Sequence, residues 1–212
     1  MIIAVDGPAA SGKGTVARAL ARHFNLPHLD TGLLYRAVAH TVRRLELDPT
    51  KEADAVAACD FDELTLADPG LRDDEVGQMA SVVSAHPLVR AALLARQKRF
   101  AHQPGGAVLD GRDIGTVIAP DADAKLFVKA TAAVRARRRH AELTARGKEL
   151  TYEQVLADIR ARDERDSHRS TAPLAQAADA APFDTSTLSI EAAVRRAIGL
   201  VEGQARGRRA TA

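Results

Sequence analysis

Nine residues near the start of the chain have the composition of a phosphate-binding loop. Gly7-Pro8-Ala9-Ala10-Ser11-Gly12-Lys13-Gly14-Thr15 follows a short apolar run, Ile2–Val5, and leads into an amphipathic segment, Val16–Phe24. Glycines let the backbone turn so that successive N–H groups point at phosphate oxygens, while the lysine can reach the β- and γ-phosphates. The loop therefore predicts a nucleoside triphosphate site over residues 7–15, with Lys13 as a catalytic cation.

The residue after Lys13 indicates which class of enzymes this phosphate-binding loop resembles. The usual loop carries Ser or Thr at that position, whereas this chain has Gly14 followed by Thr15. A GKGT ending is similar to that of nucleoside monophosphate kinases. Thr15 is a candidate Mg²⁺ ligand, and the alternative is an ion held mainly by phosphates and water.

A second group of chemically capable residues follows an apolar run near the middle of the chain. Val108-Leu109 leads into Asp110-Gly111-Arg112-Asp113. Charged side chains at the carboxyl end of a strand lie where open α/β sheets bind ligands. A structural turn would explain the glycine and one aspartate, but not an arginine between two carboxylates. The segment is therefore predicted to form part of the site.

Two arginine-rich segments admit two interpretations. Residues 135–146 and 162–169 lie on either side of Gly147 and carry many positive charges. The simpler interpretation is a pair of solvated helices with surface ion pairs. The alternative is a mobile flap over residues 132–169 that brings arginines close to phosphates.

An α/β fold must position these segments. Strands are expected at Ile2–Val5, His28–Leu29, Ala107–Leu109, Lys125–Val128 and Ala181–Phe183. Helices are expected at Val16–Phe24, Leu34–Leu45, Asp73–Ala85, Leu88–His102, Ala132–Arg146, Tyr152–Arg165 and Ile190–Gly203. This alternation implies crossover connections and a buried sheet. We predict a single domain over residues 1–212 with three layers, a five-stranded parallel sheet and helices on both faces. Residues 204–212 lose periodicity and are predicted to be a disordered tail.

Composition excludes several functional classes. A net charge of +2 and an aromatic content of 3% over 212 residues argue against a nucleic-acid partner. No apolar run approaches the ~20 residues of a membrane span, and a strand beginning at residue 2 leaves no room for a signal peptide. One cysteine, Cys59, suits a reducing compartment. A cytoplasmic enzyme without a membrane partner is therefore expected.

Six motifs occur in order along the chain. They are GPAASGKGT (7–15), LDTGLLYR (29–36), SVVSAHPLVR (81–90), DGRDIGT (110–116), RARRRHAEL (135–143) and RDERDSHRSTAPL (162–174). Together they resemble the bacterial cytidylate kinase family nearly from end to end. The resemblance implies a monomeric P-loop kinase that uses ATP and Mg²⁺ to phosphorylate CMP or dCMP. It also implies an acceptor-binding subdomain over about residues 31–90 and a lid over about 132–169.

The resemblance implies a role for each matched residue. Acceptor-phosphate clamps would be Arg36 and Arg112, the latter also catalytic, with Thr31 in the same acceptor site. Readers of the cytosine edge would be Ser81, Arg90, Asp113 and Arg169, and ribose contacts would be Arg162 and Asp166. Catalytic donors from the lid to the transferring phosphate would be Arg137, Arg138 and Arg139. Cytosine offers one exocyclic amine and ring acceptors, which a carboxylate and arginines complement.

One stretch departs from the family pattern. The family usually carries a β-rich insertion before Ser81, and residues 48–80 are roughly ten residues shorter than its long form. Thr65–Leu66 would be the remnant of its hairpin, and Arg72 would mark where the family pattern resumes. The acceptor-binding subdomain is therefore expected to be small.

Two rival functions are compatible with a phosphate-binding loop. The first has the same chemistry on another acceptor, such as UMP, AMP or a small metabolite. The second is a nucleotide switch, but switch GTPases read guanine with Asn-Lys-x-Asp, and the only asparagine here is Asn25 in Phe24-Asn25-Leu26.

Overall fold

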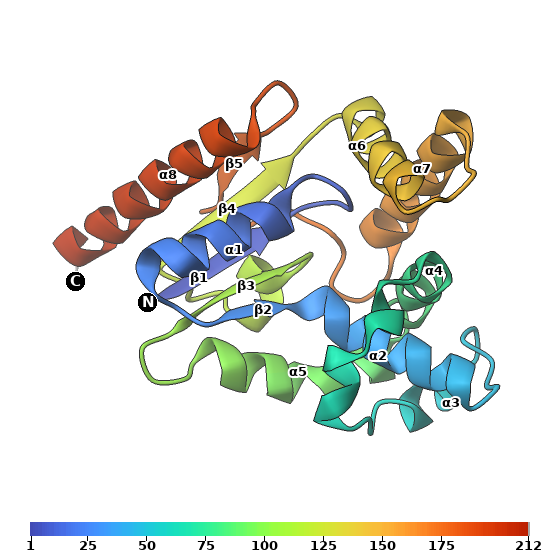
Figure 1. The fold of residues 1–212 in the computed structure, drawn as a ribbon. Helices are drawn as coiled ribbons and strands as arrows, with labels where there is room; N and C mark the ends of the chain where they lie inside the picture. The colour runs from blue at the N-terminus through green and yellow to red at the C-terminus, as the bar shows by residue number, and fades with distance from the viewer. Residues whose placement is uncertain (212) are drawn as a thin grey trace.

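The centre of the protein is a five-stranded, wholly parallel sheet (Figure 1). The computed structural model describes the backbone of residues 1–211 and the side chains of residues 1–208. Its strands are β1 (Ile2–Asp6), β2 (His28–Asp30), β3 (Ala107–Gly111), β4 (Ala124–Lys129) and β5 (Ala181–Asp184), in the order β2-β3-β1-β4-β5. All five lie at the predicted positions, and the predicted α/β class is confirmed.

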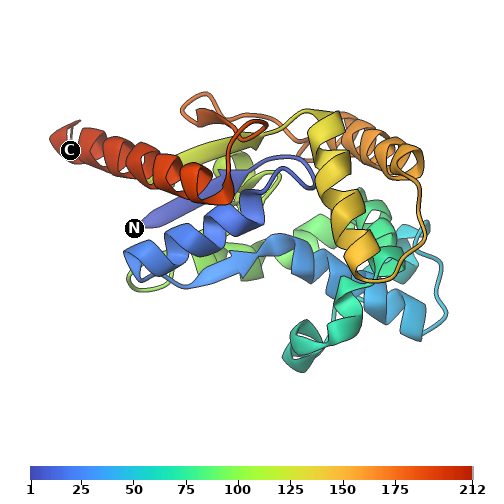
Figure 2. The same ribbon diagram turned by 45° about the horizontal axis from the view of Figure 1, so that its top comes forward.

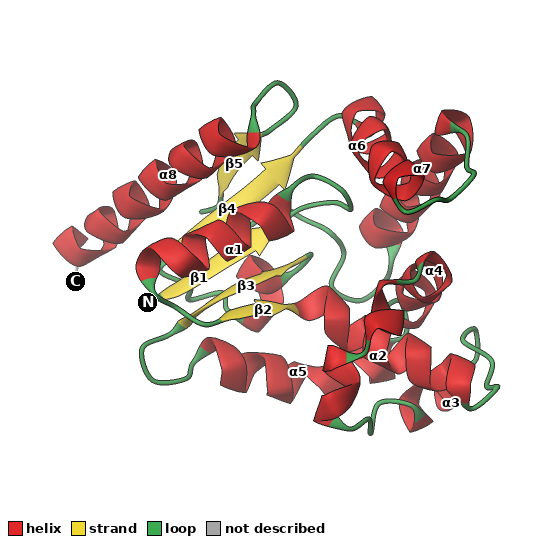
Figure 3. Cartoon of the chain, viewed as in Figure 1, coloured by secondary structure: helices red, strands yellow, loops and turns green. Residues whose placement is uncertain are grey.

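Helices cover both faces of this sheet (Figure 3). The helices are α1 (Lys13–Phe24), α2 (Thr31–Arg44), α3 (Glu52–Ala57), α4 (Asp74–Val83), α5 (Pro87–Ala101), α6 (Ala132–Ala145), α7 (Tyr152–His168) and α8 (Ile190–Thr211). Helices α1 and α8 pack on one face, and α5 packs on the other beside a π-helical turn, Ile114–Ile118. Among the described residues, no helix is long and apolar enough to cross a membrane.

Strand β1 shows how the sequence builds the two faces. Ile3 and Val5 contribute to the core under α1 and α8, whereas Ala4 between them belongs to the core under α5. Successive side chains of a strand point to opposite faces, so the apolar run Ile2–Val5 serves both layers at once. A strand buried on both sides places its carboxyl end, and the loop that follows it, at the edge where ligands bind.

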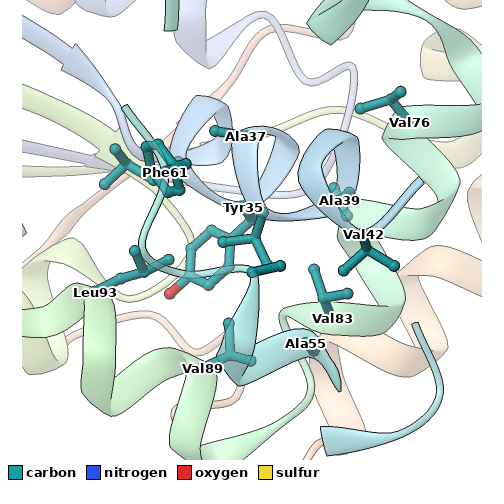
Figure 4. Close-up of a cluster of buried hydrophobic side chains, with 14 of the residues drawn as sticks. Tyr35, Ala37, Ala39, Val42, Ala55, Phe61, Val76, Val83, Val89 and Leu93 are labelled. Atoms are coloured by element: carbon teal, nitrogen blue, oxygen red, sulfur yellow. The ribbon is translucent and has the colours of Figure 1, made fainter. Parts of the chain in front are cut away.

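Two further apolar clusters lie outside the central sheet. The first joins α2, α3, α4 and α5, and Figure 4 shows its side chains, including Tyr35 and Phe61. The second joins α6 and α7 through Ala136, Leu143 and Val155.

The stretch between α2 and α4 is wholly helical or irregular. The sequence predicted that Thr65–Leu66 is the remnant of a hairpin. This prediction is wrong, because residues 48–80 are all described and contain no strand. These two residues lie in a 3₁₀ turn, Glu63–Ala67, and a second turn spans Pro69–Arg72. The reason is local: the Asp62 and Asp68 carboxylates cap the turns by accepting from Leu64 N and Gly70 N at 2.8 and 2.7 Å.

The end of the chain also differs from the prediction. Helix α8 continues to Thr211 instead of fraying after Gly203, and only Ala212 of the expected tail lies outside the described residues. Two contacts explain the longer helix. Gln204 bonds both the N–H and the C=O of Lys125 at 2.7 and 3.1 Å, and Arg208 donates to the Asp121 carbonyl oxygen at 2.9 Å.

Candidate active site

The candidate site lies where three parallel strands end side by side. Strand β1 runs into the glycine-rich loop, β2 ends at Asp30 before α2, and β3 ends at Gly111 before Arg112. The register pairs Asp6 with Gly111 and Asp30 with Asp110, which brings all three carboxylates to one edge of the sheet. Segments far apart in sequence therefore meet here, as the sequence predicts.

The glycine-rich loop is held tightly against the sheet. A Cβ on Gly7 would lie 2.2 Å from the Val128 carbonyl oxygen, so no other residue fits there. Gly12 has φ +89° immediately before α1, a conformation that glycine adopts without strain. The hydrogen bonds of α1 begin with Thr15 N and Val16 N on the Gly12 carbonyl oxygen. N–H groups at the start of α1 are thus left to face a ligand, which suits an anion.

Lys13 points toward the end of β3. Its Nζ lies 3.8 Å from Asp110 Oδ1, and its side chain is only 15% exposed. Burial, followed by the nearby charge of Arg112, lowers the pKa of Lys13 to about 8. The lysine is therefore a poorly solvated cation that an anionic ligand would stabilise.

Asp110 organises the floor of the site. His28 Nε2 lies 2.8 Å from its Oδ2, and Thr31 Oγ1 donates to its carbonyl oxygen at 2.9 Å. The predicted acceptor residue Thr31 is thus buried beneath the site with its hydroxyl engaged. The sequence placed Asp110 in a segment predicted to form part of the site but gave no role to His28, because the 82 positions between them carry no local signal.

Asp6 links the glycine-rich loop to the segment after β3. Its two carboxylate oxygens accept from Ile114 N and Gly115 N, each at 2.8 Å. It directly precedes Gly7, and its partners directly follow Asp113. Burial raises the pKa of Asp6 to about 7, against the lowering effect of these two hydrogen bonds.

The replacement Asp6→Asn should change how stability depends on pH. Because the folded-state pKa lies above the unfolded value, Asp6 ionises first in the unfolded chain, so the free energy of unfolding of the wild type falls as the pH rises from about 4 to about 7. Asparagine cannot ionise. The difference in free energy of unfolding, variant minus wild type, should therefore be more positive at pH 8 than at pH 5 by on the order of 2–4 kcal/mol. Urea denaturation at both pH values measures this gain. An equal difference at the two pH values would contradict the assignment.

Arginines gather where an acceptor phosphate would lie. Arg112 Nε donates to Asp166 Oδ2 at 2.7 Å, and although burial opposes its charge, Asp166 keeps its pKa raised. Arg162 is half-buried, and desolvation together with the nearby charge of Arg112 lowers its pKa to about 10. Its Nε has no hydrogen-bond partner among the residues described. Arg36 donates to the Leu71 and Asp73 carbonyl oxygens at 2.7 and 3.2 Å.

A separate buried cluster forms around Asp113. Arg90 and Arg169 both pair with its carboxylate, Arg90 Nη2 on Oδ2 and Arg169 Nη2 on Oδ1 at 3.8 Å. Arg90 and Asp113 are 7% and 4% exposed. Within the described part of the chain, Arg169 Nη2 lacks a hydrogen-bond partner, which leaves a buried donor facing the site. Ser81 lies nearby and accepts from Arg165 Nε at 3.2 Å.

The helices α6 and α7 contact both sides of the site. Arg138 donates to the Thr185 carbonyl oxygen at 2.6 Å and to that of Ser11 at 3.4 Å, whereas Arg139 pairs with Asp74 of α4. Figure 2 shows α6 and α7 beside α4, and α7 contacts α4 directly. The α6–α7 segment thus contacts both the glycine-rich loop and helix α4 on the opposite side of the site.

Two further arginines of α6 have contrasting environments. Arg137 is exposed, and its guanidinium has no ion-pair or hydrogen-bond partner in the described part of the chain. Arg135 is buried instead, paired with Asp163 and donating to the Ala9 carbonyl oxygen at 3.2 Å. Helical spacing could have found it, because positions 135, 138 and 139 share one face of α6 and position 137 does not.

Comparisons with known proteins agree on one family. The family model described as cytidylate kinase matches residues 3–203. A cytidylate kinase from Xanthobacter autotrophicus is 59% identical over 208 residues, covering 98% of this chain and 100% of that protein. Another from a Bradyrhizobium species is 57% identical, covering 98% and 99%. A solved structure from Eubacterium ventriosum, of an uncharacterized protein, has a TM-score of 0.57 at 15% identity, covers 96% of this chain and 98% of that one, and supports the fold alone. This chain belongs to the cytidylate kinase family.

Proposed function

We propose that this protein transfers the γ-phosphoryl group of ATP to CMP or dCMP, giving ADP and CDP or dCDP. The observation that carries the proposal is the buried Arg90–Asp113–Arg169 cluster beside a glycine-rich loop. A carboxylate between two arginines offers one acceptor and several donors, the pattern that complements the amine and ring acceptors of cytosine.

Donor phosphates would occupy the loop Gly7–Thr15. Its backbone N–H groups and Lys13 would hold them, and the tight contact of Gly7 with β4 fixes the position of the loop. Phosphoryl transfer needs the two substrates held in line and positive charge over the transferring group. Arg138 and Arg139 reach toward opposite sides of the site and would supply that charge from the lid, with Arg137 joining them only if α6 rotates.

The acceptor nucleotide would lie on the side of α2 and α4. Its phosphate would bind Arg36 and Arg112, and its ribose would contact Arg162 and Asp166. Ser81 would join the base-reading cluster. An acceptor phosphate oxygen would attack the γ-phosphorus as the bond to the β,γ-bridging oxygen breaks, so no side chain is needed as a covalent intermediate.

Mg²⁺ would neutralise phosphate charge during this transfer. Of the residues at the loop, the Thr15 hydroxyl at the start of α1 is the candidate ligand, and ATP phosphates and water would supply the rest. No group of three His, Cys, Asp or Glu side chains within the described residues is placed to hold a metal ion.

We further propose a monomer that acts in the cytoplasm without a nucleic-acid or membrane partner. The support is the family resemblance together with composition: a net charge of +2, an aromatic content of 3% and a single cysteine. Sedimentation at several protein concentrations tests the oligomeric state.

Coupled turnover of ATP against a panel of monophosphates tests the activity. CMP and dCMP should be the best acceptors, with UMP, AMP and GMP much poorer. A higher kcat/KM for UMP or AMP than for CMP would replace the proposed acceptor while leaving the phosphoryl-transfer chemistry in place.

A further inference from the structure

The Arg90 guanidinium is held on two edges and one face. Its Nη2 pairs with Asp113, and its Nη1 donates to the Ser84 carbonyl oxygen at 3.3 Å. Its Cζ lies 5.5 Å from the centroid of the Tyr35 ring. A guanidinium over an aromatic face is attracted most strongly when both are removed from water. Here Arg90 is 7% and Tyr35 8% exposed.

Tyr35 has a polar neighbour in the core beneath the site. Figure 4 shows its ring directed from α2 toward Val89 and Leu93 of α5. Gln97 of α5 is 1% exposed. Burial raises the pKa of Tyr35, while the charge of Arg90 and the adjoining Gln97 amide oppose the rise.

These two polar side chains are costly to bury. The Tyr35 hydroxyl and the Gln97 Oε1 are buried without a hydrogen-bond partner among the described residues, and the Gln97 amide lies beside the hydroxyl. Leucine and phenylalanine would fill the same core without this cost. Polar groups kept in such a place point to a function that packing does not explain.

We propose that Tyr35 and Gln97 are positioning residues for base selection. The Tyr35 ring holds the face of Arg90, and the Gln97 amide packs beside the Tyr35 hydroxyl, so that Arg90 and Asp113 keep the geometry that reads the base. This inference rests on the proposed function and assigns to it two residues that act through Arg90.

The same core offers a matched control. Phe61 belongs to the cluster that contains Tyr35, and the Arg96 guanidinium lies over its ring at 5.3 Å. Arg96 pairs with Glu63, whose side chain is 84% exposed, and takes no part in the candidate site. Phe61→Leu therefore removes an arginine–aromatic contact from this core without disturbing Arg90.

The experiment compares Tyr35→Leu, Tyr35→Phe, Gln97→Met and Phe61→Leu with the wild type. For each, kcat and KM are measured for CMP and UMP at saturating ATP, together with the melting temperature. Tyr35→Leu should raise KM for CMP about tenfold, with kcat changed less than about threefold, and lower the CMP/UMP ratio of kcat/KM about tenfold. Tyr35→Phe keeps the ring face and loses only the hydroxyl beside Gln97, so its ratio should fall only about threefold, as in Gln97→Met.

Phe61→Leu should lower the melting temperature and leave the ratio unchanged. A folded Tyr35→Leu with the wild-type ratio overturns the proposal, as does an equal loss of ratio in Phe61→Leu. If Tyr35→Leu does not fold, Gln97→Met decides: a ratio lowered about threefold supports the proposal, and an unchanged ratio overturns it. A wild type that prefers another acceptor overturns the proposed function. The positioning role is then tested by the KM for that acceptor in the same four variants.

Discussion

Lys13→Ala is expected to lower kcat by about 10²- to 10³-fold or more while the protein remains folded. Lys13 Nζ is the cation at the end of the glycine-rich loop, and it lies 3.8 Å from Asp110 at the carboxyl edge of the sheet. Removing it costs little stability, because burial already disfavours its charge and Asp110 keeps His28 as a partner. Turnover with ATP and CMP, together with a melting curve, measures both effects.

The matched control is Lys98→Ala, an exposed lysine of α5. Its kcat should equal that of the wild type. A folded Lys13→Ala enzyme with normal turnover would remove the basis for a phosphate-binding role of the loop.

The same residue predicts a pH dependence for the wild type. The pKa of Lys13 in the free enzyme is about 8, so above that pH the cation is progressively lost before ATP binds. Bound phosphate would restore the charge, so kcat/KM for ATP should fall above pH 8 more steeply than kcat does. Steady-state profiles from pH 6 to 10 distinguish the two parameters.

The strands and most helices could be predicted because their signal is local. Ile2–Val5 reads as a buried strand from four neighbouring apolar residues, and α2 reads as a helix from the spacing of Leu34, Val38 and Val42. The chemistry-bearing segments could be placed because parallel strands deliver their loops to one edge. Both inferences use only nearby residues and one topological rule.

The remaining features depend on contacts between distant residues. The last turns of α8 are held by Gln204 on Lys125, 79 positions away, so local periodicity after Gly203 could not reveal them. The face of α6 that meets the loop was not predicted, because the packing of Ala136 and Leu143 on α7 sets the rotation of that helix. Nor does any local pattern join His28 to Asp110 or Tyr35 to Gln97.

The second large effect concerns the choice of base. Wild-type enzyme should prefer CMP and dCMP to UMP by at least about a hundredfold in kcat/KM. Asp113 would accept from the cytosine amine while Arg90 and Arg169 donate to the ring. Uracil has a carbonyl in place of the amine and an N–H in place of one ring acceptor. A buried Asp113, 4% exposed, would then face an oxygen with no proton between them.

Asp113→Ala should lose more activity on CMP than on UMP and bring the ratio below about ten. The substitution also leaves Arg90 and Arg169 buried without their carboxylate, which costs roughly 3 kcal/mol of stability, so the assays need a temperature well below the melting point. Asp113→Asn separates the two effects. It keeps the shape and offers an amide N–H to the uracil carbonyl, so its rate on UMP should exceed that of Asp113→Ala.

The sizes of these ratios decide between a base reader and a purely structural ion pair. If the Arg90–Asp113–Arg169 cluster were purely structural and contacted neither base, the loss of Asp113 would slow CMP and UMP by the same factor. If the cluster reads the base, the two acceptors respond differently, because at the position that would face Asp113 cytosine carries an amine donor and uracil a carbonyl oxygen. Equal slowing of both acceptors by Asp113→Ala, or a wild type that uses UMP as well as CMP, would therefore require the cytosine assignment to be withdrawn.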